Sequence, residues 1–419
     1  MIVLKKRDVG EYIGFVRRTP VLIALLCVAA VSAFVWFSPF SPTTYTADLP
    51  AADETPRETE PPVAHLPTPE PLKAVYMSAC VAGTPSLRAA LVALIDETEL
   101  NAVVIDVKDY SGYLSFVPAD AALQSVVSVR CRAPDMKEFL KTLHDKGVYT
   151  IGRITVFQDP VLTKTRPDLA VRRASDGGTW KDYKGLSFTD PGSHEVWDYI
   201  VSIAKASYTI GFDELNFDYI RFPSDGPMSD IAFSWSGARA KAEVLEEFFV
   251  YLSNQVRPIG AALSADLFGM TTTNTDDLNI GQVLERAEPY FDYLSPMVYP
   301  SHYPPHFLGM DNPNHYPYEV VKYSMDSAVK RFLATTTSVA LRGLSPIATT
   351  TKPSLYPKPV QEIRKLRPWL QDFDYGGNYD IAEVKAQIQA TYDAGLTSWM
   401  LWAPSNKYTR GALLPTGSP

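Results

Sequence analysis

Hydrophobic and polar positions follow two alternating patterns from about residue 72 to the C-terminus. Short apolar or β-branched runs alternate with longer stretches whose apolar positions recur every three or four residues, as expected of successive βα units around a parallel sheet. The predicted strands are residues 74–80, 102–108, 149–156, 212–219, 263–268, 292–299, 366–372 and 397–403. Helices are predicted between them, for example at residues 86–97, 135–147, 195–208, 237–256 and 383–395.

Eight strands with seven intervening connections predict an α/β fold of the (β/α)8 TIM-barrel type. An open doubly wound sheet is the alternative, and such a sheet usually has a glycine-rich first turn. The first turn of this chain, ACVAGTPS, has no GxGxxG pattern. The Pro- and Thr-rich stretch 344–360 is predicted to be a loop inserted before the seventh strand.

The N-terminal part of the chain has a different pattern. Residues 21–40 form an uncharged, apolar run that is long enough to cross a bilayer as a helix. We expect a signal anchor that leaves the basic segment 1–20 in the cytoplasm and sends the rest of the chain outward. A cleavable signal peptide is the alternative, because Val31-Ser32-Ala33 is typical of a cleavage site.

Residues 41–71 are rich in Pro, Thr, Ala and Glu and contain few large aliphatic side chains. Such a composition cannot bury enough apolar surface to fold, so this segment is predicted to be a disordered linker. The barrel is then predicted to occupy residues 72–419. The expected localisation is the cell membrane, with one span in the lipid bilayer and the barrel outside the cell.

Charged side chains are unusually frequent in the strand FDELNFDYIRFP, residues 212–223. Because side chains alternate across a strand, Leu215, Phe217 and Tyr219 are predicted to pack outward on helices. The positions predicted to face the barrel interior are Glu214, Asn216, Asp218 and Ile220.

The same alternation predicts inward polar side chains on the two preceding strands. These are Asp106 and Lys108 on the second strand, and Arg153 and Thr155 on the third. Because buried charges persist only when paired, we expect Asp106, Arg153 and Glu214 to form one network in which Arg153 neutralises two carboxylates. The alternative is that these acids lie at strand ends in solvent.

Two carboxylates are predicted at the carboxyl ends of adjacent strands, Asp218 on the fourth and Asp266 on the fifth. In a TIM barrel this end carries the active site. Glycosidic bonds are usually cleaved by two carboxyl groups, one protonating the leaving oxygen and the other acting as base or nucleophile. Asp residues at strand-to-loop junctions are also common for structural reasons, so both interpretations stay open.

Aromatic and neutral polar residues are predicted to gather at the same end of the barrel. Flat aromatic faces with a polar edge suit sugar rings, although barrels also use aromatics as core residues. The side chains predicted to line a substrate cleft are Lys108, Tyr299, His302, Gln371 and Trp402. Arg221, just beyond the fourth strand, is expected to anchor either its loop or a substrate group.

Composition narrows the classes of partner and cofactor. The net charge of −8 argues against a nucleic-acid partner. The three cysteines exclude a disulfide scaffold or a Cys-based zinc site, and leave one Cys80–Cys131 bridge possible in an oxidising compartment. The sequence contains no HExxH, Walker A or GxSxG motif, so no metal or cofactor is predicted; metal-dependent deacetylation of glycans is kept as a minor alternative.

Four separated motifs resemble a known bacterial family. They are the segment from Ala74 to Gly112, the strand FDELNFDYIRFPSDG, the stretch RPWLQDF, and the terminal AQIQATYDAGLTSWMLWAPSNKY. Together they are similar to the family of putative glycosyl hydrolase domains, and the resemblance covers about residues 73–408. It implies a (β/α)8 barrel related to glycoside hydrolases, often on secreted or membrane-anchored proteins, and gives no catalytic residues or substrate.

The fourth strand also has two looser similarities. In amylase-type barrels this strand ends in an Asp nucleophile preceded two positions earlier by an inward polar residue, a relation that Asn216 and Asp218 share; the amylase pattern has Arg at the first position. Chitinases carry DGxDxDxE here, whereas this chain has Ile220 at the place of the catalytic Glu.

Taken with the family resemblance and the two carboxylates, these features lead us to expect a glycoside hydrolase acting on an envelope or extracellular polysaccharide through Asp218 and Asp266. A catalytically inactive, glycan-binding barrel with a structural or assembly role is the alternative.

Overall fold

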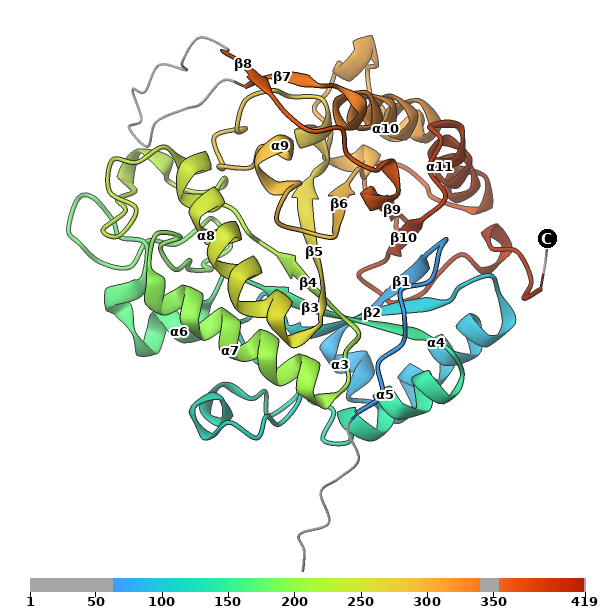
Figure 1. The fold of residues 1–419 in the computed structure, drawn as a ribbon, viewed down its shortest axis with the longest axis horizontal. Helices are drawn as coiled ribbons and strands as arrows, with labels where there is room; N and C mark the ends of the chain where they lie inside the picture. Colours follow the sequence, from blue (N-terminus) through green and yellow to red (C-terminus); the bar gives the residue numbers. More distant parts are fainter. Residues whose placement is uncertain (1–62, 340–353, 418–419) are drawn as a thin grey trace, which may run out of the picture. The chain divides into compact units, whose positions relative to one another are not determined.

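A computed structural model describes residues 63–339 and 354–417. Eight parallel strands form a closed barrel in the order β1-β10-β9-β6-β5-β4-β3-β2 (Figure 1). Their bounds are β1 Lys73–Met77, β2 Ala102–Lys108, β3 Tyr149–Thr155, β4 Glu214–Asp218, β5 Ala262–Phe268, β6 Tyr293–Met297, β9 Trp369–Gln371 and β10 Trp399–Trp402. Each lies within or overlaps one of the eight predicted strands, so the TIM-barrel prediction is confirmed.

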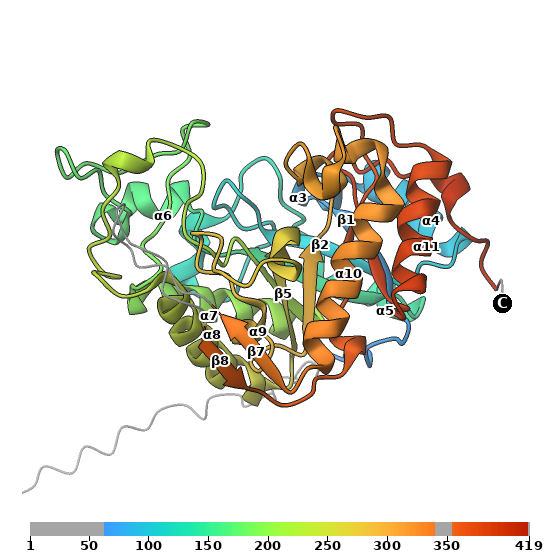
Figure 2. The same cartoon turned by 90° about the horizontal axis from the view of Figure 1, so that it is seen from above.

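Helices surround the barrel, with α7 beside α8 and α10 beside α11 in both views (Figures 1 and 2). Their bounds are α3 Ala79–Ala82, α4 Pro85–Glu97, α5 Met136–Asp145, α6 Pro160–Thr165, α7 His194–Ile210, α8 Lys241–Val256, α9 Leu284–Ala287, α10 Pro317–Leu333 and α11 Ile381–Asp393. Helix α5 illustrates why these segments are helical. Its buried residues Met136, Phe139, Leu140 and Leu143 follow the spacing of one helix face.

Two hydrophobic clusters show which strand faces point inward. Val103, Ile105 and Leu215 belong to the large cluster between the strands and the helices. Tyr76 and Val104 belong to a smaller cluster, together with Trp369, inside the barrel. Each strand thus has one face toward the helices and one toward the interior, which explains why the strands are buried on both sides and form continuous apolar runs.

The predicted alternation fails at the end of β4. Tyr219 has φ 52°, a left-handed conformation that non-glycine residues rarely adopt. The strand therefore ends at Asp218. Ile220, predicted to face the interior, packs instead with the outer cluster, and Tyr219 contacts a separate small cluster around Trp180 and Phe188.

Residues 63–71 were predicted to be part of the linker, but they contact the barrel. The Leu66 N–H donates to Asp213 at 2.7 Å, and Thr68 is hydrogen-bonded to Tyr149 at 2.9 Å. Leu66 also packs against the interior cluster. Composition could not predict these contacts, because they are mainly hydrogen bonds and need few apolar side chains.

The structure contains the disulfide that the sequence left possible, between Cys80 and Cys131. Part of the predicted loop 344–360 is instead a strand, since β8 Ser354–Pro357 pairs antiparallel with β7 Thr336–Val339 outside the barrel. Among the described residues, no helix is both long and apolar enough to span a membrane; the predicted anchor at 21–40 lies outside these residues.

Candidate active site

Three carboxylates surround one arginine inside the barrel. The Arg153 Nη1 donates to Asp106 Oδ1 at 2.6 Å, and its Nε donates to Asp218 Oδ2 at 3.1 Å. A second bond joins Arg153 Nη2 to the same Asp218 oxygen. Asp266 Oδ2 lies 3.8 Å from Arg153 Nε. One guanidinium cannot neutralise three ionised carboxylates in a buried site, so this cluster favours retention of a proton.

The strand register brings these groups together. Arg153 on β3 is the direct neighbour of Asn216 on β4. Phe217 on β4 is opposite Ala265 on β5, so Asp218 and Asp266 follow one position later on adjacent strands. Asn216 thus stands where the amylase pattern has arginine, and the arginine that contacts Asp218 in this chain comes from the neighbouring strand.

Asp266 is, with Asp106, one of two carboxyl groups of the cluster whose pKa is raised by burial. Burial, and then the charge of Asp218, raise its pKa to about 8. Its Oδ1 accepts hydrogen bonds from Asn216 Nδ2 at 2.9 Å and from Trp369 Nε1 at 2.8 Å. With Oδ1 occupied by two donors, Oδ2 is the oxygen left to carry the proton.

Aromatic side chains form a wall beside the cluster. Tyr76 donates to Asp106 Oδ2 at 2.5 Å and stacks on Trp402 with ring centroids 3.9 Å apart. The Arg153 guanidinium lies 5.1 Å from the Trp402 ring. Sequence reasoning missed Tyr76, although the alternation rule applied to the first strand would have placed it inside.

Glu214 lies outside this cluster. It accepts from Arg367 Nη1 at 2.9 Å and from the Tyr149 hydroxyl at 3.2 Å, and no contact joins it to Arg153. The predicted network of Asp106, Arg153 and Glu214 therefore separates into two. Asp218 takes the place expected for Glu214, because the arginine side chain reaches toward the carboxyl end of β4 and not toward its amino end.

The predicted substrate side chains differ in their availability. Lys108 is fully buried, with Nζ 2.9 Å from Asp159 Oδ2 and 2.6 Å from the Thr155 carbonyl, because a bulge before it alters the register. The Gln371 amide is also buried, accepting from Ser301 N–H and donating to the Phe373 carbonyl.

Tyr299, His302 and Trp402 remain near the mouth of the barrel. The Tyr299 and His302 rings lie 5.2 Å apart, and Trp402 is only partly buried. His302 is exposed; desolvation by its neighbours, and then the charge of Lys184, lower the pKa of its imidazole. The roles assigned to these side chains stay predictions.

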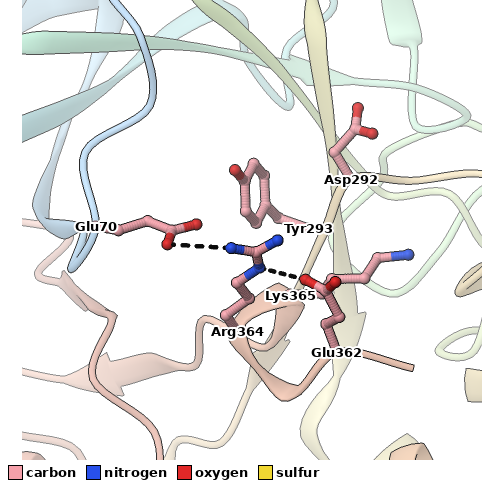
Figure 3. Close-up of a pocket in the computed structure, with 6 residues that line it drawn as sticks. All are labelled: Glu70, Asp292, Tyr293, Glu362, Arg364 and Lys365. Atoms are coloured by element: carbon pink, nitrogen blue, oxygen red, sulfur yellow. Dashed lines mark hydrogen bonds and ion pairs between the residues drawn. The ribbon is translucent and has the colours of Figure 1, made fainter. Parts of the chain in front are cut away.

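Cavities occur at both ends of the barrel. One of about 380 Å³ is lined by Tyr219 and Arg221, which follow the carboxyl end of β4. Another, of about 350 Å³, lies at the amino ends of the strands and is lined by Tyr293 and Lys365 among others (Figure 3). There Arg364 pairs with Glu70 and Glu362. Only the first is at the end where TIM-barrel active sites lie.

Metal-binding residues do not cluster in the described parts of the chain. Within residues 63–339 and 354–417, no group of three or more His, Cys, Asp or Glu side chains has the arrangement of a metal site.

A solved structure shows the same barrel in another protein. The glycoside hydrolase domain of PgaB (BpsB) from Bordetella bronchiseptica is 12% identical, with a TM-score of 0.55, covering 82% of this chain and 99% of that one. This likeness shows the fold alone. A hypothetical protein from Ruminiclostridium thermocellum is 35% identical over 46% of this chain and 96% of its own, with a TM-score of 0.42. No curated protein matches this chain.

A family model described as "Putative glycosyl hydrolase domain" matches residues 74–408. The match runs from β1 to just beyond β10 and includes all four strands of the Arg153 cluster. This chain therefore belongs to the family of putative glycosyl hydrolase domains.

Proposed function

We propose that the protein is a glycoside hydrolase in which Asp266 is the general acid and Asp218 the nucleophile. The observation that carries this proposal is the pair's asymmetry. Asp218 accepts two hydrogen bonds from Arg153, whereas Asp266 lies farther from the arginine and has a pKa raised to about 8. Two carboxyl groups whose environments push their protonation apart are the arrangement that glycosidic cleavage requires.

We propose a retaining mechanism, because the upper bound on the separation of the two groups excludes most of the inverting range. The Arg153 Nε lies 3.1 Å from Asp218 Oδ2 and 3.8 Å from Asp266 Oδ2, so these oxygens are less than 7 Å apart. Carboxyl groups of inverting enzymes are about 6.5–9.5 Å apart, and those of retaining enzymes about 5–5.5 Å. In the proposed reaction, Asp266 protonates the glycosidic oxygen while Asp218 attacks the anomeric carbon. Water then hydrolyses the glycosyl ester, with Asp266 taking its proton.

The proposed substrate is an envelope or extracellular polysaccharide. The predicted anchor at 21–40 would hold the barrel outside the membrane, where such polymers lie. The proposed sugar contacts are Trp402, Tyr299 and His302, which lie near the Arg153 cluster. Gln371 is left out because its side-chain amide already forms buried hydrogen bonds within the protein. Lys108 is left out, since its ammonium is buried against Asp159.

The test is release of reducing ends from cell-wall and common polysaccharides by the purified protein, compared with Asp218→Asn and Asp266→Asn. Both variants should lose activity by about 10³-fold or more. Asp145→Asn, at an exposed acid on α5, is the matched control and should be unaffected. The anomer formed first, followed by NMR, should have the configuration of the substrate. Activity that survives Asp218→Asn would refute the assignment.

A catalytically inactive, glycan-binding barrel is the second candidate. It is favoured by the burial of the pair, since Asp218 is 5% and Asp266 1% exposed. In that case the cluster only supports the barrel mouth. Glycan binding without turnover, unchanged by Asp218→Asn, would select this candidate.

A further inference from the structure

The cavity beside Arg221 is built around an arginine that the protein only partly satisfies. The Arg221 guanidinium lies 4.9 Å from the Phe268 ring and 5.0 Å from the Tyr219 ring. Its Nη1 donates to the Phe222 carbonyl at 3.2 Å and to Ser224 Oγ at 3.1 Å. These contacts hold the plane of the guanidinium in one orientation.

The remaining donors of Arg221 have no partner among the described residues. Both printed hydrogen bonds use Nη1, so Nε and Nη2 are left open, and no carboxylate forms an ion pair with them. The Lys184 ammonium lines the same cavity and is likewise unpaired within the described chain. Nε and Nη2 form one edge of the guanidinium fork, whose geometry matches the two oxygens of a carboxylate.

The acidic residues of the cavity do not close this fork. Asp182 Oδ1 already accepts the N–H groups of Lys184 and Leu186, and Asp225 is exposed. Their charges balance those of the two cations, so selection here rests on the geometry of the fork and not on a strongly positive field. The acids are suited to accept hydroxyl groups of a sugar whose acidic group lies on the arginine.

The cavity lies beyond the carboxyl end of β4, the strand that carries Asp218. Tyr219, which lines it, directly follows Asp218 and is held with φ 52°. Burial lowers the pKa of Arg221, and the charges of Tyr219 and Asp218 act on it in the opposite direction. On the other side, Lys184 is near enough to His302 to affect its pKa.

We propose that this cavity is a subsite for an acidic sugar residue, whose carboxylate is bound by Nε and Nη2 of Arg221 with support from Lys184. Its volume of about 380 Å³ is in the range of small-ligand sites. This inference rests on the proposed glycoside hydrolase function, and specifies its substrate as a polysaccharide containing carboxylated sugars next to the cleaved bond.

The test is calorimetric binding to the full-length protein of tetrasaccharides from polygalacturonate, alginate and hyaluronan, each beside its carboxyl-reduced form. At least one acidic tetrasaccharide should bind more tightly than its reduced counterpart by about 10- to 100-fold. Arg221→Gln should abolish that preference, and Arg221→Lys should restore only part of it. Arg173→Gln, at an exposed arginine of the neighbouring loop, is the matched control and should keep the preference.

Several outcomes would overturn the inference: equal binding of both forms, no acidic tetrasaccharide bound at millimolar concentration, or a preference unaffected by Arg221→Gln in a variant with wild-type thermal unfolding. Failure of the proposed subsite and failure of the proposed hydrolase give different results in these experiments. Arg221-dependent binding without cleavage would refute the proposed hydrolase and leave the subsite standing. Cleavage of neutral glycans alone, abolished by Asp218→Asn but not by Arg221→Gln, would refute the subsite and leave the hydrolase.

Discussion

Asp266 combines features that can be tested one residue at a time. Because the charge of Asp218 helps to raise its pKa, Asp218→Asn should lower the pKa of Asp266 from about 8, whether or not the protein is catalytically active. Carbon-13 NMR of labelled aspartate side chains would follow the titration. An unchanged pKa in this variant would show that burial alone sets the protonation of Asp266.

The same group predicts a pH profile. A general acid with a pKa near 8 is protonated below that pH, so activity should fall as the pH rises through about 8. Initial rates of reducing-end release between pH 5 and pH 10 would measure this. A plateau extending to pH 10 would contradict the role given to Asp266.

Arg153 is expected to matter more for stability than any other residue of the cluster. Arg153→Met would leave Asp106, Asp218 and Asp266 facing one another without a cation, so we expect a loss of about 3–5 kcal/mol at neutral pH. The loss should shrink in acid, where the carboxylates are protonated. Urea unfolding measures both, with the exposed Arg173→Met as control. A variant as stable as the wild type would refute the shared network.

Among the elements, the segment before β1 is fixed by a buried carboxylate. Asp213 accepts from Leu66 N–H at 2.7 Å, from His144 Nε2 at 3.0 Å and from Thr150 N–H at 2.8 Å. Burial alone would raise the pKa of Asp213, but these donors and His65 outweigh it and lower the pKa to about 2. Asp213 therefore joins residues 63–71, α5 and β3.

This lowered pKa predicts a stability difference that depends on pH. The contribution is present above the unfolded value near 3.8 and is lost as the pH falls toward 2; it amounts to about 2 kcal/mol. Asp213→Asn should thus be less stable than the wild type at pH 6, with a smaller difference at pH 2.5. Urea unfolding at both pH values tests this. A difference that grows in acid would contradict it.

The disulfide joins the segments that follow two neighbouring strands, β1 and β2. Cys80 lies in α3 after β1, and Cys131 lies between β2 and α5, 51 residues later. A disulfide that closes a loop of this length lowers the entropy of the unfolded chain and so adds about 4 kcal/mol to the free energy of unfolding. The variant with both cysteines replaced by Ser should be less stable by about this amount in urea unfolding. Reductant should destabilise the wild type and leave the variant unchanged; equal sensitivity of both would exclude a role for this bond.

Across the whole molecule, the sequence predicted the barrel better than the contacts inside it. Strands such as β2 are buried on both faces, which gives continuous apolar runs that are easy to identify. Alternation then gave the inward direction of Arg153 and Asp218. It could not give the partner of Glu214, because Arg367 is 153 positions away and precedes its own strand. The bulge before Lys108 and the positive φ of Tyr219 are likewise set by tertiary structure.

The closure of the barrel is uneven, and this predicts where it opens first. Strands β6 and β9 share one paired position, Met297 with Trp369, and the chain before β9 adds one bridge, Leu294 with Leu366, whereas β2 and β3 stay paired from Ala102 to Lys108. Segments with few backbone pairs open at lower free energy. Amides of β9 should therefore exchange with deuterium before those of β2 and β3. The indole N–H of Trp369, on β9, also donates a hydrogen bond to Asp266 on β5. Trp369→Phe removes this bond, so the amides of β9 should exchange faster, whereas those of β2 and β3 should keep their rates. Earliest exchange in β2 or β3 would show that another pair of strands limits the stability of the closed barrel.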